Sequence, residues 1–363
     1  WGRSRVEIEH AVPEFREQWA AQGWSALAAP APEFAVQVPE VLSAAERAVD
    51  ADGPRRVSVA LANPEHEHDL LQLGRYIGTG RAEGGHVAGI HLVDVPLQTP
   101  LRSARAQFTE RPSLERAIAD LAQEAAARPS TNDLDHTPLE ATDIESVIDV
   151  AHDVFGGLID ETQAQTSDML LMGWQGGFNV GRIYNSPIQR IVSDLPADLG
   201  VLKDRGFDSV DQILLPWGGG LHAQLGLEIA VRVARITDAT VHLLRVVRED
   251  VDVEDEKAAL DDTVQGLVDT DRVEYLVRQS DSVTGGIDAT LTEADYDFAI
   301  IGASREWSLR QVLFGSIPDV VADRADCSVL MVRRYVPNTL SVRAVEGVKR
   351  LKETVGLTTS PEE

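Results

Sequence analysis

The feature of this sequence that most restricts its fold is a segment type that occurs twice: an apolar run, a glycine, a polar stretch and a helix-starting residue. The first copy reads MLLMGWQGGFNVGRIYNSPIQRIV and contains Gly173, Gly176, Asn185 and Ser186. The second copy reads FAIIGASREWSLRQVLFGSIPDVV and contains Gly302, Arg305, Gly315 and Ser316. Short apolar runs bounded by turn residues are typical of buried parallel strands. The repetition therefore predicts two domains built on one plan.

Both segments have the composition of a phosphate-binding turn. Glycines directly after a strand let the backbone turn sharply and come close to a ligand. A serine at the start of the next helix caps that helix, whose first N–H groups attract anions. Neither copy is the P-loop pattern, because no Gly-Lys-Ser/Thr follows, and neither is the Rossmann dinucleotide fingerprint.

Strands and helices alternate along both repeats. The first repeat has predicted strands at 56–62 and 87–95 around a helix at 66–76, and the second has strands at 212–217 and 241–247 around a helix at 223–236. The last strands fall near 199–202 and 327–332. This alternation predicts an α/β fold with parallel pairing and right-handed crossovers. The predicted domains are 51–206 and 207–336, preceded by residues 1–50 and followed by a tail at 337–363.

The first repeat is longer than the second between its first and fourth strands. We expect the extra residues between Thr99 and Thr142, where RPSTNDLDHTP is polar and rich in turn residues. This insertion is either a lid or partner loop, or a surface excursion without a role.

The glycine segments resemble those of the universal stress protein family, whose nucleotide-binding members carry Gly, two residues, Gly, nine residues, then Gly and Ser or Thr. The second copy keeps this spacing from Gly302 to Gly315 and Ser316, but Arg305 replaces the second glycine. The first copy keeps Gly173 and Gly176 but has eight residues before Asn185 and Ser186. The resemblance covers roughly residues 55 to 335.

This resemblance implies two tandem Rossmann-like (adenine nucleotide alpha hydrolase-like) domains, each with a five-stranded parallel sheet of order 3-2-1-4-5. We expect them to be related by a pseudo-two-fold axis and to associate through their last strands. Open parallel sheets bind ligands where the strand order reverses, here between strands 1 and 4. Phosphates would lie at the glycine turn, and base and ribose at the ends of strands 1 and 2.

The sequence departs from the nucleotide-binding members after strand 1. Those members place an Asp there, whereas this chain has Ala62, Asn63 and Pro64 in one repeat and Trp217 followed by Gly218–Gly220 in the other. Trp217 either fills the base pocket or stacks on a ligand, the glycines form an anion nest, and Arg305 either contacts a phosphate or occupies its site. The predicted ligand-binding residues are Gly302, Arg305, Gly315, Ser316, Trp217, Gly218, Gly173, Gly176, Asn185 and Ser186.

The charge of the chain restricts its partners. The formal net charge of −26 over 363 residues argues against nucleic acid or an anionic membrane as a direct partner of the globular body. Arginine supplies nearly all the positive charge, since the only lysines are Lys203, Lys257, Lys349 and Lys352. Such an acidic, lysine-poor composition resembles that of cytosolic proteins from salt-accumulating microbes, and an ordinary acidic protein is the alternative.

The N-terminal residues suggest a membrane connection. WGRSRVEIEH opens with an aromatic residue and two arginines, as chains do after leaving a membrane on the cytoplasmic side. Tandem universal stress domains resembling these are attached to the C-termini of amino-acid permeases in halophilic microbes. The resemblance therefore implies a juxtamembrane helix and linker at 1–50, an attached or partner membrane transporter, and a location at the cytoplasmic face of the cell membrane.

No catalytic or metal-binding constellation emerges from the sequence. The run Glu65, His66, Glu67 and His68 alternates early in a helix and does not share a face, so we interpret it as a solvated acidic helix start. Cys327, the sole cysteine, opens an apolar run and is interpreted as a buried structural thiol. We therefore expect no metal and no catalytic residue.

Three function classes remain. The favoured one is a regulatory sensor that binds a nucleotide or other anionic effector, with ATP, AMP or a cyclic dinucleotide as candidates, and modulates an amino-acid transporter. The second is an assembly module without a ligand, in which the two repeats form a pseudo-dimer through their last strands. The third and weakest is a slow ATPase, because neither copy offers a general base or a magnesium carboxylate beside the glycine turn.

Overall fold

The computed structural model describes residues 53–80, 84–108, 110–127, 142–174, 191–192, 194–207, 209–265, 267–268, 271–303, 321–322 and 324–335. All of them lie within one compact unit of the chain, Ala48–Val336. We call residues 53–207 the first half and residues 209–335 the second half. The predicted segments 1–50 and 337–363 lie outside the described residues.

Apart from η2 (Pro64–His66) and α4 (Leu101–Arg105), which have no counterpart in the second half, the two halves have the same order of described strands and helices. The first half contains β1 (Arg56–Ala60), the short 3-10 helix η2 (Pro64–His66), α3 (Glu67–Gly78), β2 (His86–Asp94), α4 (Leu101–Arg105), α5 (Pro112–Ala127), β3 (Asp143–Ala151), α6 (Val154–Ala164), β4 (Met169–Gly173) and β5 (Asp198–Lys203). The second half contains β6 (Gln212–Pro216), α8 (Leu221–Thr237), β7 (Thr240–Val247), α9 (Val253–Gln265), β8 (Val273–Gln279), α10 (Val283–Glu293), β9 (Phe298–Gly302) and β10 (Ser328–Arg333). The predicted strands 1, 2 and 5 of both halves are confirmed to within a few residues.

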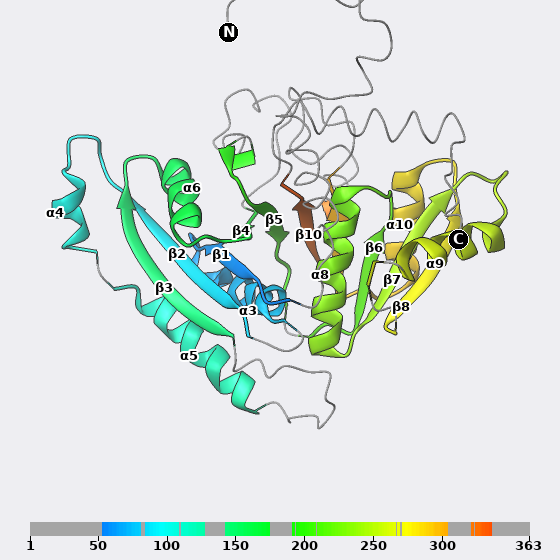
Figure 1. The fold of residues 1–363 in the computed structure, drawn as a ribbon, viewed down its shortest axis with the longest axis horizontal. Coiled ribbons are helices and arrows are strands. Elements are labelled where there is room, and N and C mark those ends of the chain that lie inside the picture. Colours follow the sequence, from blue (N-terminus) through cyan, green and yellow to red (C-terminus); the bar gives the residue numbers. More distant parts are fainter. Residues whose placement is uncertain are drawn as a thin grey trace, which may run out of the picture. The chain divides into compact units, whose positions relative to one another are not determined.

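The strands form one sheet of ten in the order β3-β2-β1-β4-β5-β10-β9-β6-β7-β8 (Figure 1). The first five strands follow the predicted order 3-2-1-4-5, and the second five follow the same order read from the other edge. All neighbouring strands are parallel except β5 and β10, which are antiparallel. The prediction of two separate five-stranded sheets is therefore wrong.

The two halves share a sheet because their last strands are apolar on both faces. Leu199, Val201 and Leu202 of β5 and every residue of β10 from Ser328 to Val332 are buried. Such a strand left at an edge would expose backbone donors and acceptors beside buried apolar side chains. Pairing the two strands with each other satisfies both edges at once.

The register of this pairing has the symmetry of a two-fold axis. Val201 and Met331, which hold the same place in their strands, pair with each other, and Leu199 pairs with Arg333 as Val329 pairs with Lys203. β5 and β10 pair with each other, so the expected association through the last strands is present between the two halves of one chain. Association between copies of the chain stays a prediction.

Helices cover both faces of the sheet and create two core layers. One cluster packs α3, α5, α8 and α9 against alternate strand residues such as Val57 and Ile213, and it extends across both halves. The other packs α6 and α10 against the opposite face, through residues such as Leu170 and Leu214. The inner strands β4, β5, β9 and β10 read as nearly continuous apolar runs because both of their faces are buried, whereas the outer strands β3 and β8 are more polar and more exposed.

The segment between Thr99 and Thr142, within which the extra residues were predicted, contains two helices, α4 and α5. α5 is the counterpart of α9, whereas α4 has no counterpart between β7 and α9. A small cluster of Val95, Ala104 and Val150 holds α4 beside the end of β3. Residues 128–141, which include the turn-rich stretch, lie outside the described residues.

Candidate functional site

The strand order of the second half reverses between β6 and β9, which are hydrogen-bonded neighbours. α8 starts directly after β6, so its N-terminal turn lies beside the carboxyl ends of both strands. An open parallel sheet binds ligands at such a position. We take this edge as the candidate site.

The three glycines Gly218–Gly220 connect the end of β6 to the start of α8. Gly219 and Gly220 have φ angles of 69° and 83°, in the left-handed region that favours glycine. Gly220 is the N-cap residue of α8 and has no side chain to bond the first N–H groups of the helix. A methyl group added at Gly218 would meet no atom within 4 Å. This helix start is therefore neither capped by a side chain at its N-cap nor crowded at Gly218, which suits an approaching anion.

Gly302 brings the end of β9 against this helix start. A Cβ added at Gly302 would lie 2.8 Å from both the backbone N of Ala223 and the carbonyl carbon of His222. Those atoms belong to backbone and cannot move aside as a flexible side chain would, so only glycine fits. In the first half, the nearest atom to a Cβ at Gly173 is Leu70 Cδ1 at 3.4 Å, an ordinary to slightly tight contact. In the second half, Gly302 thus lies close to the backbone of α8. The close approach to a ligand that both glycine segments predict stays a prediction.

Trp217 is a buried residue of the core. It is 7% exposed, and its backbone N donates to the carbonyl of Leu244 at 2.7 Å. A ring that is so buried has little face left for a ligand base. Whether Trp217 fills a base pocket or stacks on a ligand stays a prediction.

A cation that sequence reasoning missed lies at the end of β7. Nη1 of Arg245 donates to the carbonyl oxygen of Trp217 at 3.2 Å, and Nε donates to Oε1 of Glu256 on α9 at 2.8 Å. Both side chains are partly exposed. Arg245 stands in the run HLLRVV, and the arginine in this apolar strand was the only available signal.

His222, in the first turn of α8, connects the site to the end of β10. Its Nδ1 accepts a hydrogen bond from the backbone N of Arg334 at 3.0 Å, which fixes that nitrogen as unprotonated. Burial, together with the nearby Arg333 and Arg334 cations, lowers the pKa of His222 to about 4. His66 holds the equivalent place in the first half and pairs through Nδ1 with Asp204, which follows β5, at 2.6 Å.

The equivalent edge of the first half is occupied by its own side chains. Arg111, just before α5, forms an ion pair with Glu67 and donates through Nη1 to Nε2 of His91 at 2.6 Å. Its Nη2 also donates to the carbonyl oxygen of Ala62 at 3.3 Å. Glu67 is only 1% exposed, so the interpretation of residues 65–68 as a solvated helix start is wrong for this residue. The error arose because the partner, Arg111, lies 44 positions away in the sequence.

Several predicted ligand-binding residues lie outside the described residues. They are Gly176, Asn185, Ser186, Arg305, Gly315 and Ser316. Their roles therefore stay predictions. Gly302, Gly173, Trp217 and Gly218 are described, and the first, third and fourth lie around the same edge of the second half.

Metal binding and thiol chemistry find no support in the described ranges. Within them, no group of three or more His, Cys, Asp or Glu side chains is placed to hold a metal ion. Burial raises the pKa of Cys327 to about 11, which keeps this thiol protonated.

No helix of the described part is long and apolar enough to cross a membrane.

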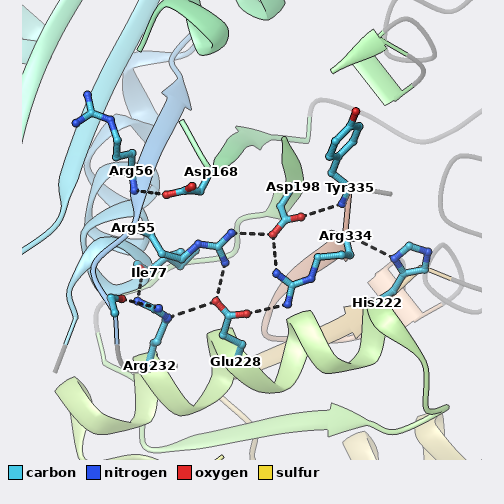
Figure 2. A network of polar contacts seen from close by, with 11 residues as sticks. Arg55, Arg56, Ile77, Asp168, Asp198, His222, Glu228, Arg232, Arg334 and Tyr335 are labelled. Atoms are coloured by element: carbon cyan, nitrogen blue, oxygen red, sulfur yellow. Dashed lines mark hydrogen bonds and ion pairs between the residues drawn. The ribbon is translucent and has the colours of Figure 1, made fainter. Parts of the chain in front are cut away.

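A buried charge network joins the two halves (Figure 2). Arg55, before β1, donates to Asp198 at 2.7 Å and to Glu228 of α8 at 2.9 Å. Arg334 donates to the same two carboxylates, at 3.0 Å and 2.8 Å. Arg232 of α8 donates to the carbonyl oxygen of Ile77 at 3.0 Å and lies 3.7 Å from Glu228. Each carboxylate thus contacts cations from both halves.

The fold is an α/β fold with a mostly parallel sheet, and the candidate site lies where the strand order of the second half reverses. Residues 209–333 match the model of the universal stress protein family, so the predicted resemblance is confirmed for the second half. No curated protein matches the chain.

Solved structures with similar folds include universal stress proteins and one transporter domain. A universal stress protein from Archaeoglobus fulgidus DSM 4304 has 16% identity, covers 77% of this chain and 97% of its own, and has a TM-score of 0.49. The cytoplasmic domain of a prokaryotic cation chloride cotransporter has 11% identity, covers 78% and 96%, and also has a TM-score of 0.49. A universal stress protein in complex with cAMP has 16% identity, covers 35% and 99%, and has a TM-score of 0.29.

Proposed function

We propose that this chain is a regulatory module that binds a phosphate-bearing effector at the second-half site and modulates an attached or partner amino-acid transporter. The observation that carries the binding role is Gly302, whose Cα lies directly against the first turn of α8 in the segment that matches the universal stress protein model. Glycine at that position and a helix start with no N-cap side chain are two parts of a phosphate site. ATP, AMP and cyclic dinucleotides are the candidate effectors.

The binding role is tested by calorimetry with these three ligands on the wild-type chain and two glycine variants. Gly302→Ala places a methyl group against backbone atoms of α8, so we expect it to weaken binding at least about tenfold. Gly78→Ala is the matched control, because Gly78 is the last residue of α3 in the first half and a methyl group there makes only ordinary contacts, at 3.5 Å or more. Circular dichroism of both variants separates lost binding from lost folding.

Two results would redirect the proposal. If none of the three ligands gives heat up to millimolar concentration, the ligand-free assembly module becomes the better reading, with the β5–β10 pairing as its structural basis. The proposal also includes no catalysis, so steady release of phosphate from ATP that Gly302→Ala abolishes would favour the slow ATPase instead.

The transporter role rests on the resemblance of the tandem repeats to permease-attached domains and places the module at the cytoplasmic face of the cell membrane. It is tested by chemical cross-linking in native membranes followed by mass spectrometry of peptides from residues 53–335. Peptides joined to a multi-spanning amino-acid transporter, or continuous with one, support the proposal. Recovery of the chain in the soluble fraction without such a link would contradict it.

A further inference from the structure

The two halves differ in the side chains that contact the ends of strands 1 and 2, which border the candidate site. Residues can be compared across the halves because Leu61 N donates to Ile90 O as Trp217 N donates to Leu244 O. His91 of β2 is therefore the counterpart of Arg245 of β7. In both halves this residue donates to the carbonyl at the end of strand 1, His91 Nδ1 to Leu61 at 2.8 Å and Arg245 Nη1 to Trp217 at 3.2 Å.

In the first half, a buried ion pair closes this position. The side chain of Arg111 is 12% exposed and that of Glu67 is 1% exposed. Arg111 also bonds His91 and Ala62, so the ends of both strands are covered. Burial and the adjacent Arg111 cation lower the pKa of His91, in keeping with a neutral ring that accepts at Nε2. Opening this position would leave the Glu67 carboxylate buried without its cation, which is strongly unfavourable.

In the second half, the same position holds a pair that opens easily. The side chains of Arg245 and Glu256 are 36% and 27% exposed, and ion pairs so close to solvent contribute little to stability. The counterpart of Glu67 is Ala223, so no buried carboxylate remains there. The counterpart of Arg111 is Asp252, whose Oδ1 accepts from Glu254 N at 2.9 Å and Asp255 N at 3.1 Å at the start of α9. Asp252 therefore caps the start of α9, and the side chain that contacts the end of strand 1 is Arg245.

We propose that Arg245 binds an anionic group of the effector and that this group displaces the Glu256 carboxylate. In the first half, Arg111 and Glu67 occupy the equivalent position, so each chain binds one ligand. This inference rests on the proposed function and narrows it. The effector carries two separated anionic groups, one at the Gly302 turn and the start of α8, and one that reaches the Arg245 guanidinium. A guanidinium binds carboxylate and phosphate oxygens through the same pair of parallel hydrogen bonds.

The closure of the first half is tested without any ligand. Phenylglyoxal modifies accessible guanidinium groups, and mass spectrometry of the modified chain ranks the arginines by rate. Arg248, which is 83% exposed, sets the fast limit, and the fully buried Arg232 sets the slow limit. We expect Arg245 to react at a rate near that of Arg248 and Arg111 at a rate near that of Arg232. Similar rates for Arg111 and Arg245 would overturn the closure, whether or not a nucleotide binds.

The role of Arg245 is tested by calorimetry with ATP and a cyclic dinucleotide. We expect one ligand per chain, at least about tenfold weaker binding in Arg245→Met, and tighter binding in Glu256→Gln, because the competing carboxylate is removed. Arg248→Met is the matched control and should bind as the wild-type chain does. Two ligands per chain, or unchanged binding in Arg245→Met, would overturn the assignment.

The two failures can be told apart. If neither nucleotide gives heat, the proposed function fails in its nucleotide form, and the role of Arg245 fails with it. If nucleotides bind and Gly302→Ala weakens them while Arg245→Met does not, the proposed function stands and this inference alone is wrong.

Discussion

His222 illustrates how one side chain makes stability depend on pH. Its Nδ1 accepts from Arg334 N, so the folded chain holds this ring neutral, and its pKa is lowered to about 4 by burial and the neighbouring Arg333 and Arg334. In the unfolded chain the ring titrates near its ordinary value of about 6.5. Between these two values the unfolded state binds a proton that the folded state does not, so acidification favours unfolding.

We therefore expect His222 to destabilise the fold progressively as the pH falls from about 6.5 to about 4, by about 3 kcal/mol in total at about 1.4 kcal/mol per pH unit. The measurement is urea unfolding of the wild-type chain and His222→Gln at several pH values. Glu228 acts in the opposite direction, because burial raises the pKa of its carboxyl, so the difference between the two chains is the quantity to follow. A difference that does not change between pH 7 and pH 4.5 would contradict this role.

At the residue scale, the sequence predicted what depends on local backbone. Gly302 and the glycines before α8 were found because a strand followed by glycine has a direct conformational meaning. Arg245, Glu67 and Arg111 were missed, since their contacts join residues from different strands and helices. A charged residue in an apolar strand shows that it needs a partner but does not reveal which one.

At the element scale, the junction of the halves depends on a few buried carboxylates. Asp198, at the start of β5, accepts from Arg55, Arg334 and the backbone N of Tyr335. Removing this carboxylate leaves two largely buried guanidinium groups with only Glu228 to share, and breaking buried pairs costs about 3 to 5 kcal/mol.

We expect Asp198→Ala to lower the free energy of unfolding by about 3 kcal/mol or more. The control is Asp288→Ala, which breaks a pair with Arg324 in which both side chains are exposed and should cost less than about 1 kcal/mol. Equilibrium unfolding in urea measures both. Equal losses in the two variants would show that the network does not stabilise the junction.

Most elements were predicted because the buried strands of each repeat are apolar runs that lie between turn residues. The prediction failed at the scale of the sheet, where two five-stranded sheets are one sheet of ten. An apolar run shows that a strand is buried on both faces, but the same run suits an inner strand of one sheet or a strand paired to another domain. β5 and β10 are such runs, and only their antiparallel register distinguishes the two cases.

At the scale of the whole molecule, the net charge of −26 determines how stability responds to salt. Like charges on the surface repel each other, and the compact state suffers more from that repulsion than the extended chain. Salt shortens the screening length from about 10 Å at 0.1 M to about 3 Å at 1 M.

We expect the midpoint of thermal unfolding to rise by at least about 3 °C between dilute buffer and molar potassium chloride. Calorimetry or circular dichroism measures this midpoint. Sodium sulfate and potassium chloride compared at equal ionic strength separate screening from a general salting-out effect. An unchanged midpoint would mean that the acidic surface is not under appreciable repulsion, and the halophilic interpretation would fail.

The β5–β10 pairing also has an evolutionary consequence. When two identical chains form a symmetric dimer, every mutation appears on both sides, so neither side can lose a ligand while the other keeps it. Here the equivalent strands belong to one polypeptide, and Val201 pairs with Met331 across an axis that relates different sequences. A substitution in one half therefore leaves the other half unchanged, so one half can change while the other keeps its structural role.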